Sequence, residues 1–257
     1  LARKITQLYK LSGELLSDQK HYDWELRALK PVLAMAGALH RHEPALPEDV
    51  VLIRALKDAS LPKLVGPDFT MFIALLDDLF PRVVVPARNS SAIETAIENQ
   101  ISGQEVQKLV KVPALVAKVV QLYETLQSRH GVGIVGAPGT GKSTAQQLLR
   151  DALNALNSES AEYATVSLKT LNPKAISYGQ LYGEFNAASH EWTDGLVPAL
   201  VRQFVSDSPF DNKWLVFDGP VDPVWIESMN TVLDDNKLLC LSNGERIQLP
   251  DSVSLFR

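Results

Sequence analysis

Hydrophobic positions recur at helical spacing through the first third of the chain. Apolar residues three or four positions apart predict one buried face for each helix within residues 1–80. We expect the following residues on these faces: Ile5, Leu8, Leu11, Leu15, Leu26, Leu29, Leu33, Ala36, Val50, Ile53, Leu56, Phe69, Phe72, Ile73, Leu76 and Leu79. Pro31 falls inside the predicted helix 24–42, where a proline favours a kink. Helices without a strand predict a small helical bundle.

Two prolines interrupt the helical pattern after residue 80. Pro81 and Pro86 bracket the apolar run Val83-Val84-Val85, which predicts an extended connector between domains. The helical pattern returns over residues 91–129. The predicted division is a helical domain at 1–80, a connector with leading helices at 81–130, and a further domain at 131–257.

The second half of the chain alternates short apolar runs with helical patterns, which is typical of an α/β fold with a parallel sheet. Predicted strands lie at 131–135, 163–168, 213–217 and 253–256, and predicted helices at 145–153, 179–185, 196–205 and 224–233. A loop is expected at 190–195. Residues 238–249 predict a β-hairpin, because two alternating runs flank Asn243-Gly244. The predicted fold is α/β, a partial P-loop sheet with flanking helices preceded by an all-helical small domain.

Composition narrows the function classes. The 257 residues are 46% hydrophobic and 21% charged, which suits a globular protein of about two domains. The net charge of −5 and the lack of a basic block do not indicate a nucleic-acid partner, and no apolar run predicts a membrane span. The single cysteine, Cys240, excludes an internal disulfide and a multi-cysteine metal site. The chain begins at Leu1 inside a helical pattern, so we expect a piece of a longer protein.

The most specific motif is the stretch 136–144, which fits G-x-x-x-x-G-K-[ST], the phosphate-binding P-loop. A predicted strand precedes it and a predicted helix follows it, as the motif requires. Glycines let backbone N–H groups approach phosphate oxygens, and a helix N-terminus favours negative charge. We expect Lys142 to reach the terminal phosphates and Ser143 to hold Mg²⁺. The predicted nucleotide-binding residues here are Gly136, Ala137, Pro138, Gly139, Thr140, Gly141, Lys142, Ser143 and Thr144.

A second candidate is Asp218, which directly follows the apolar run 213–217. A parallel strand would deliver this carboxylate to the nucleotide side of the sheet, opposite Ser143, where it could hold Mg²⁺ directly or through water. Many P-loop ATPases place a glutamate next, which polarises the attacking water, but here Gly219 follows. Asp222 is better explained as the N-cap of the next helix. These residues therefore predict a site that binds Mg-ATP and hydrolyses it poorly, and we assign no catalytic residue.

Several long stretches resemble the second AAA+ module of dynein heavy chains. They are Val216–Asp222, Trp225–Lys237, Leu171–Ile176, Gln180–Gly183 and Glu191–Gly195. Residues 49–56 and 61–63 resemble the helical small domain that closes the first module of that family. Phe185-Asn186 and Gly219–Asp222 are closer to axonemal than to cytoplasmic heavy chains.

The resemblance implies that residues 1–80 are the small, or lid, domain of a preceding AAA+ module. Residues 131–257 would be a large domain that is incomplete at its C-terminus. Implied cofactors are ATP or ADP with Mg²⁺, and the implied role is a regulatory module that holds ATP with little hydrolysis. Arg27 matches the sensor arginine of the preceding module, although Glu25 stands where the family has glycine. Val83 and Val84 would line the adenine pocket, and the hairpin 238–249 would touch the linker.

The same resemblance implies a minus-end-directed microtubule motor ring that drives ciliary or flagellar movement. Implied partners are the rest of the heavy-chain ring and its linker, intermediate and light chains, and microtubules through distant regions, with no nucleic acid and no membrane. The implied location is the cytoplasm and cytoskeleton, in the ciliary or flagellar axoneme.

From the residues alone, two other classes stay open. One is a hydrolytic AAA+ remodelling ATPase or chaperone, which Gly219 disfavours. The other is a structural ring segment whose pocket is empty or holds ADP, which the intact Lys142, Ser143 and Asp218 disfavour. Val83-Val84 could equally be a plain linker, and Arg27 a solvated helix charge.

Overall fold

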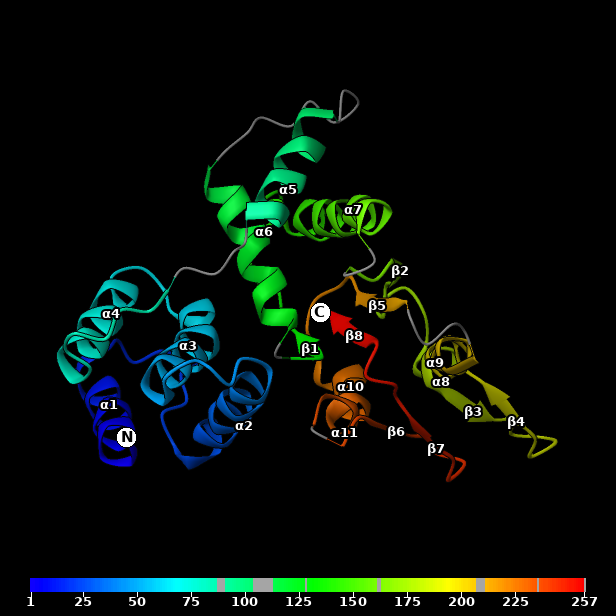
Figure 1. Ribbon diagram of the computed structural model, residues 1–257. Coiled ribbons are helices and arrows are strands. Elements are labelled where there is room, and N and C mark those ends of the chain that lie inside the picture. The colour runs from blue at the N-terminus through cyan, green and yellow to red at the C-terminus, as the bar shows by residue number, and fades with distance from the viewer. Residues whose placement is uncertain are drawn as a thin grey trace. The chain divides into compact units, whose positions relative to one another are not determined.

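The protein forms two compact units, Leu1–Asn89 and Ser90–Arg257, in a computed structural model (Figure 1). The structure describes residues 1–86, 91–103, 113–127, 129–160, 163–206, 211–234 and 236–256. The helices that follow the connector belong to the second unit, whereas the sequence pattern groups them with the connector.

The first unit is entirely helical in its described residues. Its elements are α1 Ala2–Leu15, α2 Leu26–His42, α3 Glu48–Ser60, the short 3-10 helix η1 Leu61–Lys63 and α4 Asp68–Leu79. Helix α3 is buried along most of its length, which makes it the centre of the bundle. The remaining helices contribute Leu8, Val32, Phe72 and Leu76 to the same core. The predicted bundle is therefore present.

Some of the residues predicted on buried faces are exposed instead. Leu15 is the last residue of α1, Leu26 is the first of α2, and Phe69 lies in the first turn of α4, and each is more than 40% exposed. Terminal turns extend past the core, and a periodic pattern does not show where the core ends. In α2, Val32 is buried while Leu33 is 49% exposed, so the buried face is rotated from the predicted one.

The connector is attached to the first unit. Val83 and Val85 pack against the helical core. Arg54 of α3 is 8% exposed, and its Nη2 donates to the Pro86 carbonyl oxygen at 3.0 Å. Its Nη1 pairs with Glu43 at 3.2 Å. A buried arginine that has lost its hydration needs such partners, so these contacts hold the connector in place.

The second unit is built on a four-stranded parallel sheet with strand order β1-β8-β5-β2 (Figure 1). The strands are β1 Gly131–Val132, β2 Val166–Leu171, β5 Asn212–Phe217 and β8 Val253–Phe256. The predicted strand at 131–135 is cut to two residues, and Val135 is 94% exposed. Because all strands run the same way, their carboxyl ends share one edge of the sheet.

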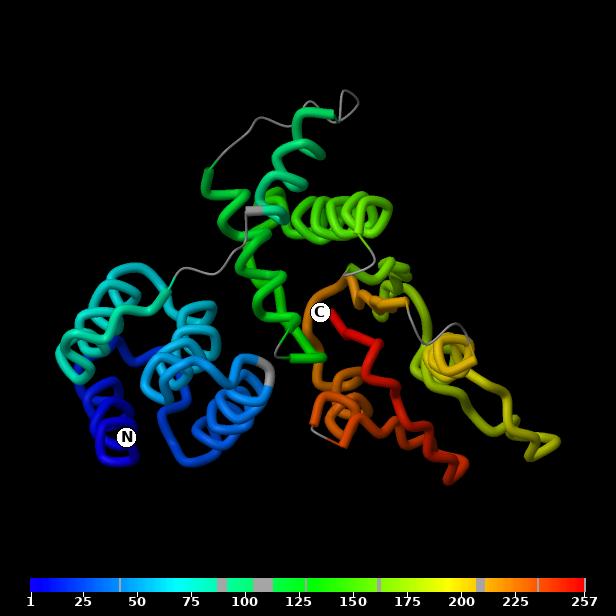
Figure 2. Tube along the Cα trace, viewed as in Figure 1, coloured from blue at the N-terminus to red at the C-terminus, as the bar shows by residue number. Residues whose placement is uncertain are grey.

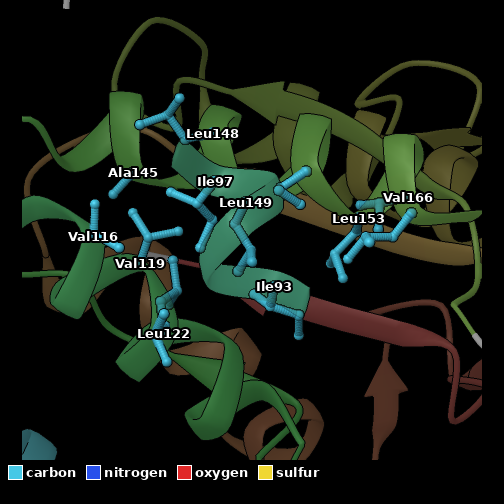
Figure 3. Close-up of a cluster of buried hydrophobic side chains, with 14 of the residues drawn as sticks. Ile93, Ile97, Val116, Val119, Leu122, Ala145, Leu148, Leu149, Leu153 and Val166 are labelled. Atoms are coloured by element: carbon cyan, nitrogen blue, oxygen red, sulfur yellow. The ribbon is translucent and has the colours of Figure 1, made fainter. Parts of the chain in front are cut away.

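Helices cover both faces of the sheet, and alternate side chains of β5 pack into the hydrophobic cores on the two faces. Trp214 and Val216 join the core formed with α5 Ser91–Gly103, α6 Pro113–Leu126 and α7 Lys142–Glu159 (Figure 3). Leu215 and Phe217 point to the opposite core. That core is formed with α8 Tyr178–Tyr182, α9 Leu196–Ser206, α10 Pro223–Ile226, η2 Glu227–Met229 and α11 Asn230–Leu233. The helical pattern predicted over 91–129 thus consists of α5 and α6, and positions 104–112 and 128 lie outside the described residues.

Two hairpins extend from the second unit (Figure 2). The predicted one is confirmed as β6 Leu238–Cys240 paired with β7 Arg246–Gln248, and Gly244 has φ +89° in its turn. The other was not predicted: the expected helix 179–185 ends at Tyr182, and β3 Gly183–Phe185 pairs with β4 Trp192–Asp194 in place of the expected loop. The helix predicted at 224–233 is interrupted by η2.

Candidate nucleotide-binding site

The P-loop joins β1 to the long helix α7, as the motif requires. Gly139 and Gly141 have φ values of +78° and +84°, which residues with a side chain rarely adopt. Gly141 is the N-cap of α7, and Lys142 is the first residue of the helix. Helix α7 is anchored because Leu148 and Leu149 are fully buried in the core beneath it. The loop therefore presents a fixed helix N-terminus.

The loop folds around its own lysine. Lys142 Nζ donates to the carbonyl oxygens of Gly136 and Ala137 at 2.8 and 2.9 Å. Thr140 Oγ1 also donates to the Ala137 oxygen, at 2.8 Å. A Cβ at position 136 would lie 2.8 Å from that threonine hydroxyl, so the close approach requires glycine. These contacts are all local to the motif.

The loop fits the phosphates of a nucleotide. A Cβ added to Gly139 or Gly141 would meet no atom within 4 Å, so the space beside the loop is open. Ser143, the second residue of α7, is exposed on the same turn. Backbone N–H groups, a helix N-terminus and an ammonium group are the donors that bind phosphate, and a hydroxyl with a carboxylate suits Mg²⁺.

Asp218 lies at the same edge of the sheet as the P-loop. It directly follows β5, and its backbone N–H donates to the Leu171 carbonyl oxygen at the end of β2, at 2.8 Å. Strand β8 lies between β1 and β5 in the parallel sheet. Topology therefore brings Asp218, which is exposed, to the carboxyl edge where the P-loop begins.

The residues after Asp218 are held against the loop that follows β2. A Cβ on Gly219 would lie 3.2 Å from Pro173 Cδ, which is a tight contact. Asp222 Oδ1 accepts from the Val224 N–H at 2.8 Å, so the predicted N-cap is confirmed. Its Oδ2 pairs with Lys174. The Lys174 ammonium group, followed by the Val224 N–H, lowers the pKa of Asp222. Both carboxylate oxygens are thus engaged.

The other predicted site residues lie in the first unit. Arg27, in the first turn of α2, has an 86% exposed side chain and pairs with Asp23 at 3.0 Å. The Glu25 N–H, followed by Arg27, lowers the pKa of Asp23. Val83 packs on the helical core, while Val84 is 83% exposed. The sensor role of Arg27 and the adenine-pocket role of the valines stay predictions.

Sequence reasoning missed two ion-pair arrangements. Lys174 reaches Asp222 across two loops, and Arg202 of α9 bridges both hairpins. Arg202 contacts Asp194 of β4 and Glu245 of the second hairpin turn, each at 2.6 Å. The pKa values of both carboxyl groups are lowered by Arg202. No local signal shows such pairs: Lys174 with Asp222 and Arg202 with Glu245 are far apart in the sequence, and Asp194 lies on β4, a strand that was not predicted.

The parts of the chain that the structure describes contain neither a cluster of metal-binding side chains nor a membrane-spanning helix. No cluster of three or more histidine, cysteine, aspartate or glutamate residues there could hold a metal ion by itself. No helix there is apolar and long enough to cross a membrane.

Comparison with known proteins identifies the family. The family model described as the hydrolytic ATP binding site of the dynein motor region matches residues 1–143, and the model of the dynein-related subfamily of AAA domains matches residues 131–256. The whole chain is 48% identical to dynein axonemal heavy chain 6 of Homo sapiens and 47% identical to dynein axonemal heavy chain 3 of Mus musculus. It spans 6% of the length of each relative. The chain therefore belongs to the dynein heavy chains, as a AAA module of the axonemal type.

Proposed function

We propose that the second unit is a regulatory site that binds Mg-ATP and hydrolyses it slowly. The observation that carries this proposal is the shared edge of the sheet: the P-loop with Lys142 and Ser143 follows β1, and Asp218, with Gly219 after it, follows β5. The parts that bind phosphate and magnesium are present. The part that positions water in hydrolytic relatives is replaced by a residue without a side chain.

The binding steps follow from the loop. Backbone N–H groups of 136–141 and the N-terminus of α7 orient the phosphates. Lys142 exchanges its carbonyl partners, Gly136 and Ala137, for phosphate oxygens and neutralises their charge. Ser143 and Asp218 would hold Mg²⁺, which supplies further neutralisation when bound.

Slow hydrolysis follows from the residues beyond Asp218. Gly219 offers no group that can accept a proton from water. Asp222 is committed to the α10 N-cap and to Lys174, so it is not free to replace the missing base. General-base assistance contributes about 10²–10⁴-fold to rate, and this site lacks that contribution.

For the chain as a whole we propose the division that the resemblance implies. Residues 1–80 would be the lid of a preceding module, with Arg27 as its sensor, and 81–130 would lead into the P-loop domain, with Val83 and Val84 beside the adenine. The family model that spans 1–143 supports this, since it crosses from the helical unit to the P-loop.

The proposed setting is an axonemal motor. Its relatives are named axonemal heavy chains. On that basis we propose a place in a minus-end-directed microtubule motor ring of the ciliary or flagellar axoneme. The proposed partners are the remaining ring, the linker, and intermediate and light chains.

The test compares two substitutions at one position. Gly219→Glu restores a carboxylate beside Asp218, and Gly219→Ala adds the same Cβ without one, so both require the same small shift of Pro173. We expect the parent and the alanine variant to retain bound ATP, and the glutamate variant to convert more of it to ADP in a single-turnover assay.

The alternative is a hydrolytic site, as the description of the family model that matches 1–143 names it. Nucleotide recovered from this pocket in the full-length heavy chain distinguishes the two. ADP that is produced and exchanged at roughly 10 s⁻¹, a median enzyme turnover, would show that the site is a working ATPase.

A further inference from the structure

The segment 218–222 is braced from the loop that follows β2. The backbone N–H of its first residue, Asp218, donates to the Leu171 carbonyl oxygen at 2.8 Å. Its second residue, Gly219, lies so close to Pro173 that an added Cβ would be 3.2 Å from Pro173 Cδ. Its last residue, Asp222, pairs with Lys174. The stretch 171–174 therefore contacts this segment at both ends.

Lys174 is itself held in a tight turn. Its backbone N–H donates to Asn172 Oδ1 at 3.0 Å, and the Ala175 N–H donates to the Asn172 carbonyl oxygen at 3.1 Å. Such a turn fixes the direction in which the next side chain leaves the backbone. The turn therefore fixes the backbone from which the Lys174 side chain leaves, and the ion pair with Asp222 holds its ammonium group.

The far end of the segment is also fixed. Trp225 of α10 stacks on Phe217, with ring centroids 5.3 Å apart, and its Nε1 donates to the Pro220 carbonyl oxygen at 3.2 Å. The Tyr182 hydroxyl donates to the Trp225 carbonyl oxygen at 2.6 Å. Trp225 thus ties α10 to β5, and the Lys174–Asp222 ion pair ties the start of α10 to the loop after β2. The segment that carries Asp218 is therefore held from both sides.

We propose that Lys174 is a positioning residue for the magnesium site. By holding Asp222 it fixes the segment that carries Asp218, and so aligns that carboxylate for the metal. Lys174 touches neither nucleotide nor metal in this assignment. The inference rests on the proposed function, because it concerns the factor by which Mg²⁺ increases the affinity for the nucleotide.

The test uses the chain with Lys174→Met, which keeps a stem of similar length and removes the ammonium group. The affinity for a fluorescent ATP analogue is measured with Mg²⁺ and again with EDTA. We expect the strengthening by Mg²⁺ to fall about tenfold, the lower end of losses seen when groups that orient metal ligands are removed. Affinity in EDTA should stay the same, and the backbone amides of 218, 219, 221 and 222 should exchange faster with deuterium without ligand.

Matched variants separate positioning from general damage. Lys174→Arg should restore the effect of Mg²⁺, and Asp222→Asn, which keeps an oxygen for the N-cap, should reproduce its loss. Lys10→Met removes an exposed ion pair with Glu14 in the first unit and should change nothing at the site. The inference would be overturned if Mg²⁺ increased the affinity of Lys174→Met for the ATP analogue as much as that of the parent. It would also be overturned if Lys174→Met bound the analogue more weakly by the same factor with Mg²⁺ and with EDTA. A parent chain that binds in neither medium would overturn the proposed function, and with it this role.

Discussion

The two loops of the candidate site are held in different ways. The P-loop is closed by contacts within its own motif, such as Lys142 with Gly136 and Ala137. The segment 218–222 is held by partners far away in the sequence, at Leu171 and Lys174. A motif can encode the first kind of loop, whereas the second kind exists only once the sheet has formed. The following predictions test that difference.

The largest effect is expected from the core beneath the P-loop. Leu149 is fully buried between α7 and its neighbours (Figure 3). Leu149→Ala should lower the free energy of unfolding by about 2–5 kcal/mol, the usual cost of such a cavity. Chemical denaturation measures this, with Gln147→Ala on the exposed side of the helix as control. A loss below about 1 kcal/mol would mean that α7 is not anchored in this way.

The next effect concerns binding alone. Lys142→Ala removes the ammonium group that binds phosphate in the proposed site, and hydrogen bonds to charged groups contribute about 1.5–3 kcal/mol. Affinity for Mg-ATP should therefore fall about 10- to 100-fold, with an unchanged denaturation midpoint. Calorimetric titration measures the affinity, and Lys10→Ala is the control. Equal affinity in both variants would show that phosphate does not bind this loop.

A smaller effect is expected from acid. The pKa of Asp222 is lowered by Lys174, so its stabilisation is present above the ordinary carboxyl range and is lost as pH falls through the lowered value. The parent should be more stable than Asp222→Asn near neutral pH, and the two should converge once pH falls below the lowered pKa of Asp222. Thermal midpoints across pH measure this. A difference that grows on acidification would contradict the argument.

The smallest effect is expected from the second hairpin. Its turn, around Asn243 and Gly244, lacks phosphate-binding chemistry and lies at the end of β6 and β7. Replacing Asn243-Gly244 by Gly-Asn should leave ATP affinity within about threefold, well inside the 1.4 kcal/mol of a tenfold change. A tenfold loss would place the hairpin in the binding site.

The sequence predicted much of the fold and those parts of the candidate site that are formed by residues close together in the chain. The P-loop, the strand that ends at Asp218 and the Asp222 N-cap were all predicted, because each depends on residues close together. The pair of Lys174 with Asp222 was not, since only the parallel pairing of β2 with β5 brings those loops together.

The hairpin β3–β4 shows a second limit. The sequence pattern predicted a helix up to Phe185. The structure buries Leu181 and Tyr182, at the end of the helix that does form. Gly183, with φ +104°, ends that helix and starts a strand of three residues. Strands this short carry no measurable alternation. They pair antiparallel over three positions, and the rings of Phe185 and Trp192 add a contact with centroids 5.1 Å apart.

Arg202 has a mechanical consequence. Its guanidinium joins both hairpins to α9, so a sideways load on either one is shared by the other and by that helix. The C-terminal part of α9 is tied in turn to β5, because the buried Lys213 donates to the Phe204 carbonyl oxygen at 2.8 Å. Asp218 directly follows β5. A pull on the hairpins thus has a route through ion pairs and hydrogen bonds to the edge of the sheet where Asp218 lies.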